Sequence, residues 1–163
     1  MPESVAPENK HEFLLEDFLP YRLSLLSNTV SQGISATYRK PFGLSVTEWR
    51  VIAILGRFPV LTASEVMQRG AMDKVAVSRA VAKLQKKGLL ERSPHSEDRR
   101  RLPLKLSPGK GSALFHKVVP RALAYEQQLL QALSEDELSR LKRLVQKLQD
   151  SAESINREDD PLS

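Results

Sequence analysis

The sequence contains no cysteine, and its three histidines are far apart along the chain. Without cysteine the protein can form no disulfide, no thiolate metal site and no thiol-based redox sensor. His11, His95 and His116 do not have the spacing of a metal-binding group. We therefore expect neither a metal ion nor any other cofactor.

Glycine is also scarce, with 7 residues in 163, and none of them belongs to a recognisable phosphate-binding loop. Gly109 and Gly111 do not lie between a strand and a helix in the pattern that such loops require. The G-x-S-x-G motif of α/β-hydrolases is absent. The acids of Ser134-Glu-Asp-Glu137 resemble a helix start, and those at 158–160 resemble a frayed helix end. These absences predict that the protein is not an enzyme.

Long apolar runs are missing as well. The first residues, MPESVAPENKHEF, lack the apolar segment of a signal peptide. No run approaches the roughly 20 apolar residues that a membrane span needs. We therefore expect a cytoplasmic protein with no membrane partner. The length of 163 residues and the hydrophobic fraction of 40% predict one folded domain over 1–163.

Positive charge is present in excess and is concentrated in one segment. Between Lys74 and Lys110 there are 11 Lys or Arg and 3 Asp or Glu, which gives a segment charge of +8. The whole chain carries +5, so the remainder carries −3. A local cationic segment of this kind is typical of a surface that binds double-stranded DNA.

Apolar spacing and capping signals predict most of the helices. From Leu23 to Tyr38 apolar residues recur every three or four positions, which predicts one long helix that ends near Gly43. In a capping box, a Ser or Thr and a Glu three residues later satisfy free N–H groups at a helix start. Three such boxes are present: Ser45-Val-Thr-Glu48, Thr62-Ala-Ser-Glu65 and Ser134-Glu-Asp-Glu137.

Glycines and an aspartate bound the two helices in the middle of the chain. The third helix should run from about 62 to 69 and end at Gly70, and the fourth should begin after Asp73 and end at Gly88. The tight turn between them is typical of a helix–turn–helix.

Two strands and a long helix follow. Short β-like runs at 89–92 and 102–106 predict a hairpin, and Ser107-Pro108 predicts the start of a fifth helix that Pro120 should kink. The predicted fold is mainly α with a small β wing, a winged helix–turn–helix with six helices.

The fourth helix is the candidate reading helix. At 100° per residue, Val77, Ala80, Val81 and Leu84 share one face and should pack into the core. The other side carries Val75, Ser78, Arg79, Ala82 and Lys86, and Lys74 stands at the start of the helix. Arginine can form a bidentate bond with guanine, serine can bond to bases or phosphate, and small apolar groups can touch a thymine methyl. Lys74 and Lys86 are better placed for phosphates.

Such a face on an isolated helix would more simply be a solvated surface. The capped helix before it and the basic hairpin after it favour DNA contact.

The predicted tip of the hairpin carries Asp98, Arg99, Arg100 and Arg101. Arginines on a narrow tip suit the minor groove, where the potential is most negative in A·T-rich tracts. Asp98 can orient one guanidinium before DNA arrives. These charges could instead only solubilise the surface, but three adjacent arginines repel one another and favour an anionic partner.

Six segments occur in a characteristic order along the chain: Leu44-Ser-Val-Thr-Glu-Trp-Arg-Val, Leu61-Thr-Ala-Ser-Glu-Val, Met72-Asp-Lys-Val-Ala-Val-Ser-Arg-Ala-Val, Leu84-Gln-Lys-Lys-Gly-Leu-Leu-Glu-Arg, Glu97-Asp-Arg-Arg and Leu106-Ser-Pro-Gly-Lys-Gly. In this order, over about residues 20 to 155, the chain resembles the MarR family of bacterial transcriptional regulators. The resemblance implies a homodimeric winged helix–turn–helix that binds a palindromic operator in double-stranded DNA, often as a repressor released by a small ligand.

The resemblance also implies roles for parts of the chain. Residues 74–87 would form the recognition helix within a DNA-binding lobe at 44–107. Asp98 and Arg100 would sit at the wing tip, with Arg100 in the minor groove. Helices at 12–41 and 108–157 would form the dimer. The family usually has an acid where this chain has Gly109, so the fifth helix lacks a carboxylate that its dipole would favour.

The small ligand is the least determined partner. Family members without cysteine commonly respond to aromatic acids, so an arginine could hold a carboxylate and an aromatic ring could stack on the ligand. The candidate residues are Tyr21, Arg22, Ser27, Asn28, Tyr38, Trp49, Arg50 and His116. Core packing is an alternative for Trp49, and an ion pair is an alternative for Arg50. An acyl or aryl thioester, or no ligand, also stays open.

Two other functions fit parts of the pattern. One is a sequence-tolerant architectural DNA-binding protein, which the mixed polar and apolar reading face disfavours. The other is a winged helix whose basic face binds an acidic protein.

Overall fold

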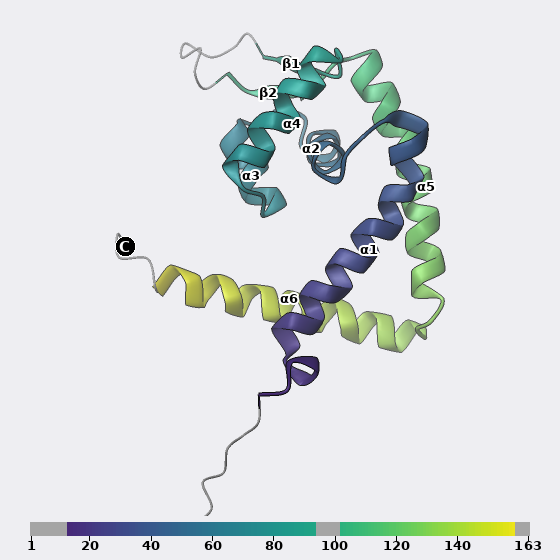
Figure 1. Ribbon diagram of the computed structural model, residues 1–163, viewed down its shortest axis with the longest axis vertical. Coiled ribbons are helices and arrows are strands. Elements are labelled where there is room, and N and C mark those ends of the chain that lie inside the picture. Colours follow the sequence, from purple (N-terminus) through teal and green to yellow (C-terminus); the bar gives the residue numbers. More distant parts are fainter. Residues whose placement is uncertain (1–12, 94–101, 159–163) are drawn as a thin grey trace, which may run out of the picture. The chain divides into compact units, whose positions relative to one another are not determined.

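The computed structural model describes residues 13–93 and 102–158. These residues form six α-helices and one two-stranded antiparallel sheet, which confirms the predicted mainly α fold with a β wing (Figure 1). The elements are a short 3₁₀ turn η1 (Leu15–Asp17), α1 (Leu19–Phe42), α2 (Val46–Arg57), α3 (Ala63–Gly70), α4 (Lys74–Lys86), β1 (Leu90–Arg92), β2 (Leu104–Leu106), α5 (Lys110–Leu130) and α6 (Glu135–Glu158).

The chain divides into two compact units, Met1–Phe115 and His116–Ser163, and α5 runs through the boundary between them. The first unit holds η1, α1 to α4, both strands and the start of α5. The second holds the rest of α5 and all of α6. The assignment of 12–41 and 108–157 to dimerisation concerns a second copy of the chain, and it stays a prediction.

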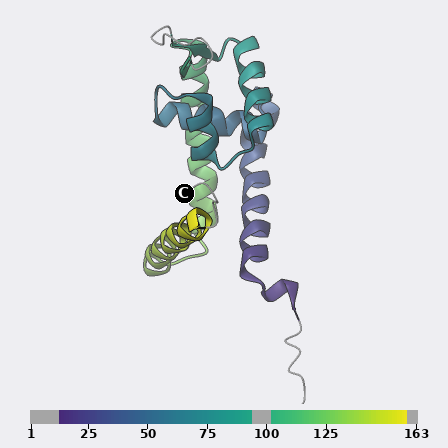
Figure 2. The same cartoon turned by 90° about the vertical axis from the view of Figure 1, so that its left-hand side faces the viewer.

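The long first helix ends at Gly43, as the sequence predicts, although Pro41 was also expected to end it. Pro20 occupies its first turn, where a missing N–H costs little, and α1 continues without interruption for 24 residues (Figure 2). Gly43 adopts a left-handed backbone, with φ of 62°, and its N–H donates to the Arg39 carbonyl. Pro41 lies inside the last turn of the helix and does not itself end it.

All three capping boxes form. The Ser45 and Thr62 hydroxyls accept from the N–H groups of Glu48 and Glu65, and the two glutamates accept in return from the cap N–H groups. Glu137 makes the same exchange with Ser134. The Thr62 backbone and hydroxyl bonds stabilise the charged form of Glu65 and so lower its pKa.

The helix α3 ends at Gly70, as the sequence predicts, but Gly70 is not the residue that turns the chain. Gly70 is the last residue of the helix, and the left-handed residue is Ala71, with φ of 46°. Gly70 packs closely: a Cβ on it would lie 3.1 Å from Ile54 Cδ1, and the end of the Met72 side chain would have to move. Glycine at this position thus brings α3 close to α2, while alanine accepts the strained turn.

The core of the first unit lies between α2, α3, α4 and the strands. Val77, Ala80, Val81 and Leu84 of α4 are all buried, as predicted. They meet a core that also contains Val51, Ile52 and Leu55 from α2, Val66 from α3, and Leu89, Leu90 and Leu104 around the strands. The face of α4 that points away from this core is therefore fixed by packing.

The two strands are shorter than predicted but lie where the sequence places them. They pair antiparallel, with Leu90 opposite Leu106 and Arg92 opposite Leu104. A third segment that the sequence did not suggest joins them, because Leu61 forms an isolated bridge with Leu104. The wing is thus tied to the residue that precedes α3.

The start of α5 differs from the prediction. The helix begins at Lys110, after a turn at Pro108 and Gly109, and not at Pro108. Ser107 still caps it, since its hydroxyl accepts from the Gly111 N–H at 2.7 Å. Gly111 has no room for a side chain, because a Cβ would collide with the Leu89 carbonyl. Pro120 lies inside α5, which runs on to Leu130.

Within residues 13–93 and 102–158, no helix combines the length and apolar character that crossing a membrane would require. In the same part of the chain, no three His, Asp or Glu side chains come together as a metal site would need.

Candidate nucleic-acid interface

The helix α4 is the centre of the candidate interface, and its start is set by one aspartate. Asp73 Oδ1 accepts from the Ala76 N–H at 2.8 Å, which satisfies one of the free donors of the first turn. Gly88, with φ of 70°, turns the chain into β1 just after the helix. Both ends of α4 therefore follow from local chemistry.

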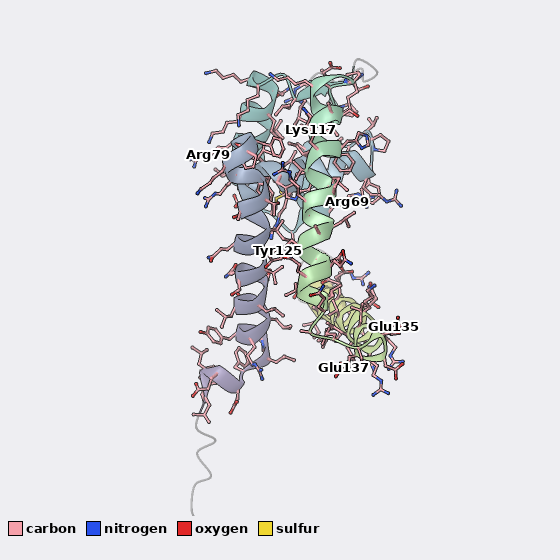
Figure 3. The ribbon with its side chains drawn as sticks, turned by 90° about the vertical axis from the view of Figure 1, so that its right-hand side faces the viewer. Arg69, Arg79, Lys117, Tyr125, Glu135 and Glu137 are labelled. Atoms are coloured by element: carbon pink, nitrogen blue, oxygen red, sulfur yellow. The ribbon has the colours of Figure 1, made fainter. Side chains whose placement is uncertain are left out.

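The structure places every predicted reading residue of α4 on its exposed side. These residues are Lys74, Val75, Ser78, Arg79, Ala82 and Lys86. Val75 is 57% exposed although it is apolar. Arg79 extends outward from the first unit (Figure 3). This face combines a guanidinium, a hydroxyl and small apolar groups, the chemistry that reads base edges.

A groove of about 480 Å³ lies at the edge of this face, between α3, α4 and β1. Its lining residues are Ala63, Ser64, Met67, Lys74, Val77, Ser78, Val81, Ala82, Gln85 and Arg92. Ser78 and Ala82 form part of the wall, and Arg92 brings a positive charge from the wing. The helix and the wing therefore share one concave surface.

Gln85 and Arg92 also belong to this surface and were not predicted from the sequence. Gln85 could have been found, since 100° per residue places it about 20° from Ser78 on α4. Arg92 could not, because its approach to α4 depends on how β1 leaves the helix.

The cations of α4 fall into two classes. Lys83 and Lys87 lie near the carboxylate of Glu48, with Nζ to oxygen distances of 4.0 and 3.1 Å. In the part of the chain that the structure describes, no carboxylate lies within 4 Å of Lys74, Arg79 or Lys86. These last three charges point into solvent and are free to meet an anionic partner.

The wing tip itself, with Asp98, Arg99, Arg100 and Arg101, lies outside the described residues. The flanking backbone is held by a hydrogen bond of 2.7 Å from the Ser93 N–H to the Pro103 carbonyl. Across the two strands, Lys105 Nζ lies 3.4 Å from Glu91 Oε2. The hairpin base is thus well formed on both sides of the predicted tip.

The candidate ligand residues separate into different places. Tyr38 is buried, and its ring lies 5.6 Å from that of Trp49, which in turn lies 6.4 Å from the ring of Phe115. Burial raises the pKa of Tyr38, while Arg50 and Arg39 act in the opposite direction. Trp49 is therefore part of an aromatic stack within the first unit. Arg50 Nη2 donates to Ser31 Oγ at 3.3 Å and makes no ion pair among the described residues.

The other candidates on α1 are distant from this stack. Tyr21, Arg22, Ser27 and Asn28 are exposed in the N-terminal half of the helix. Arg22 precedes Tyr38 by 16 residues, which corresponds to roughly 24 Å along a helix axis. His116 is exposed and belongs to the second unit. Within the first unit, the structure does not bring the exposed candidates of α1 and the Tyr38–Trp49 pair together into one pocket.

Known proteins match both the sequence and this arrangement. A family model described as the MarR family matches residues 42–101, the part that contains α2, α3, α4 and the wing. The multiple antibiotic resistance protein MarR of Escherichia coli is 27% identical over 139 residues, which cover 83% of this chain and 94% of that protein. The chain belongs to the MarR family.

Solved structures of MarR-family regulators have the same fold. A MarR/EmrR family regulator from Acinetobacter sp. ADP1 is 30% identical, with a TM-score of 0.79 over 86% of this chain and 99% of that one. A MarR variant from Escherichia coli, solved in complex with operator DNA, is 25% identical, with a TM-score of 0.67 over 83% of this chain and 97% of that one. The protein is thus a MarR-family transcriptional regulator with a winged-helix fold.

Proposed function

We propose that this MarR-family protein is a homodimer that binds a palindromic operator and represses transcription until a small ligand releases it. The observation that carries the proposal is the exposed side of α4. It presents Arg79, Ser78 and small apolar groups without carboxylate partners among the described residues, next to a groove shared with the wing.

The chemistry of this face divides into two tasks. Arg79 and Ser78, with Val75 and Ala82, read base edges in the major groove. Lys74 and Lys86 contact phosphates and set affinity and register. The wing residues Asp98, Arg99, Arg100 and Arg101 reach the neighbouring minor groove, where Arg100 inserts. The Escherichia coli relative that was solved in complex with operator DNA supports operator DNA as the partner.

Exposed apolar side chains support a second copy of the chain as a partner. In the first unit they are Phe13, Leu14, Leu15, Phe18, Leu19, Tyr21, Leu23, Leu25 and Leu26; in the second they are Leu123, Leu129, Leu141, Leu144, Val145, Leu148 and Ile155. Apolar surface of this extent is typical of an interface. A two-fold dimer would present two α4 helices to successive major grooves, about 34 Å apart.

The ligand step follows from this spacing. A small aromatic or acidic compound would release DNA if it bound better to a dimer whose two α4 helices are not spaced to fit successive major grooves. A ligand shifts the population from one conformation to another only when it binds the two with different affinity. Arg22 or Arg50 would hold its carboxylate. Because Tyr21, Arg22, Ser27 and Asn28 are far from Tyr38 and Trp49 in one chain, we place any site that uses both groups at contacts between two copies.

Selection from a pool of randomised DNA duplexes tests the proposal. The expected result is enrichment of a palindrome whose half-sites are centred about 10 base pairs apart, or a multiple of that spacing. Light scattering of the complex should give two chains per selected duplex.

The alternatives give different outcomes. An architectural DNA-binding protein would retain the whole pool and enrich no sequence. A winged helix that binds an acidic protein would retain no duplex even at low salt. Either result would reject operator recognition as the function.

A further inference from the structure

The carboxylate of Glu48 lies at a junction that the functions above do not use. Glu48 is in the first turn of α2, and its side chain is 4% exposed. Its Oε2 accepts from Lys87 Nζ at 3.1 Å, and its Oε1 lies 4.0 Å from Lys83 Nζ. A buried carboxylate is costly unless it is paired, so the ion pair with Lys87, the C-cap residue of α4, stabilises the buried Glu48, and the more distant Lys83 adds to it.

The other capping boxes show that this geometry is not needed to cap a helix. Glu65 accepts from the Thr62 N–H at 2.7 Å, and Glu137 accepts from the Ser134 N–H at 2.8 Å, and both glutamates are exposed. The matching distance from the Ser45 N–H to Glu48 is 3.4 Å. The Glu48 carboxylate thus sits closer to Lys87 than to the cap that its position in the box would serve.

Lys87 joins the end of α4 to more than one element. Its Nζ also donates to the Gly43 carbonyl at the end of α1, at 3.0 Å. Its own carbonyl accepts from Lys110 Nζ at the start of α5, at 2.8 Å. The next carbonyl, of Gly88, accepts from Ser107 Oγ at 2.8 Å. We call this set of Glu48, Lys87, Gly43, Lys110 and Ser107 the α4 anchor.

We infer that Glu48 is a positioning residue for sequence recognition, which acts by fixing the C-terminal end of α4 through Lys87. This inference rests on the proposed binding of an operator by α4. Lys87 faces Glu48 and so is withheld from DNA phosphates, in contrast to Lys74 and Lys86. Bonds to base edges depend on the direction of the side chain, whereas phosphate contacts carry no sequence information. Loosening the α4 anchor should therefore weaken discrimination between sequences more than it weakens general affinity.

The test compares a selected operator with a random duplex, using the full-length protein. Glu48→Gln keeps the size of the side chain and removes its charge. The expected result is a fall on the order of tenfold in the ratio of operator to random affinity, the size of effect that one mismatched base pair produces. Affinity for the random duplex should not fall, and the dependence of binding on salt should not change.

Lys87→Met gives a second, independent variant at a half-exposed position. It should lower the same ratio, and the double variant should be no worse than the worse single one, because both changes break one interaction. Glu137→Gln removes the matching carboxylate from the exposed capping box of α6 and should leave the ratio unchanged.

Three outcomes would overturn the inference. If folded Glu48→Gln melts at a lower temperature yet keeps the parent ratio, the residue is structural only. If Lys87→Met reduces the salt slope by about 1 and weakens both duplexes alike, Lys87 is itself a phosphate contact. An unchanged ratio in Lys87→Met likewise rejects the inference, whether or not Glu48→Gln folds. Failure of the parent protein to prefer any duplex would instead reject the proposed function.

Discussion

Leu61 and Leu104 exchange two backbone hydrogen bonds, although 43 positions separate them. The Leu61 N–H donates to the Leu104 carbonyl at 3.1 Å, and the Leu104 N–H donates to the Leu61 carbonyl at 2.6 Å. Leu61 precedes the Thr62 cap of α3, and Leu104 begins β2. The wing and the helix–turn–helix are therefore joined by backbone, and the predicted tip is carried on a strand anchored to α3.

The first prediction concerns the stability of this joint. Leu104 is fully buried, so Leu104→Ala should lower the free energy of unfolding by about 2–5 kcal/mol, through lost burial and a cavity. Urea denaturation measures the change. Lys105→Ala is the control on the same strand, because a surface pair such as Lys105–Glu91 contributes only about 0–1 kcal/mol. Equal losses of unfolding free energy in the two variants would show that β2 contributes no side chain to the buried core.

Much of the fold could be predicted because its signals are local. A cap is chemistry between residues three positions apart, so Ser45 with Glu48 and Thr62 with Glu65 mark helix starts without any knowledge of the rest of the chain. The faces of α4 follow from the helix period, since Val77 and Leu84 on one side and Ser78 and Arg79 on the other differ only in angle.

Long-range contacts could not be predicted in the same way. The Leu61 bridge involves one residue, which has no periodicity to detect. Gly70 is the last residue of α3, but the left-handed residue is Ala71, and a Cβ on Gly70 would lie 3.1 Å from Ile54 Cδ1. Glu48 is a capping residue by sequence, and only the fold reveals its pairing with Lys87, 39 positions away.

The second prediction concerns the start of α4. Asp73→Ala removes the acceptor of the Ala76 N–H and should cost about 1 kcal/mol of unfolding free energy. Asp73→Ser, which keeps a capping oxygen, should recover most of that loss. Thermal denaturation of the three proteins under the same conditions measures it. A serine variant as unstable as the alanine variant would mean that the negative charge of Asp73, and not its cap bond, is what matters.

Arg79 should read a base. Arg79→Ala is expected to weaken binding of a selected operator by about 1–3 kcal/mol and to relax sequence preference at one position of each half-site. Titrations of the operator and of variants with single base changes measure both effects. Arg143→Ala on α6 removes an equal charge far along the sequence from the reading helix and serves as the control. If Arg79→Ala lost affinity equally for every sequence, Arg79 would be a phosphate contact.

Arg100 is expected to act through the minor groove. Arg100→Ala should weaken an operator with A·T-rich flanks more than one with G·C-rich flanks, because a narrow A·T tract has the more negative potential. Binding to the two operators, which differ only at these flanks, measures the effect. Arg99→Ala provides a comparison from the same predicted tip. An equal loss on both operators would place Arg100 on the phosphate backbone.

The last prediction concerns the dimer. Leu148 is 47% exposed on α6, within the apolar stripe that also contains Leu141 and Leu144. Burying a leucine contributes about 1.5–3 kcal/mol, and two-fold symmetry repeats each substitution, so Leu148→Glu should weaken dimerisation by at least about 3–6 kcal/mol. Sedimentation over a range of concentrations measures the shift toward single chains. Ser139→Glu adds the same charge about 180° away on α6 and should stay dimeric. A Leu148→Glu protein that still sediments as two chains at every concentration would mean that this stripe of α6 does not form the interface.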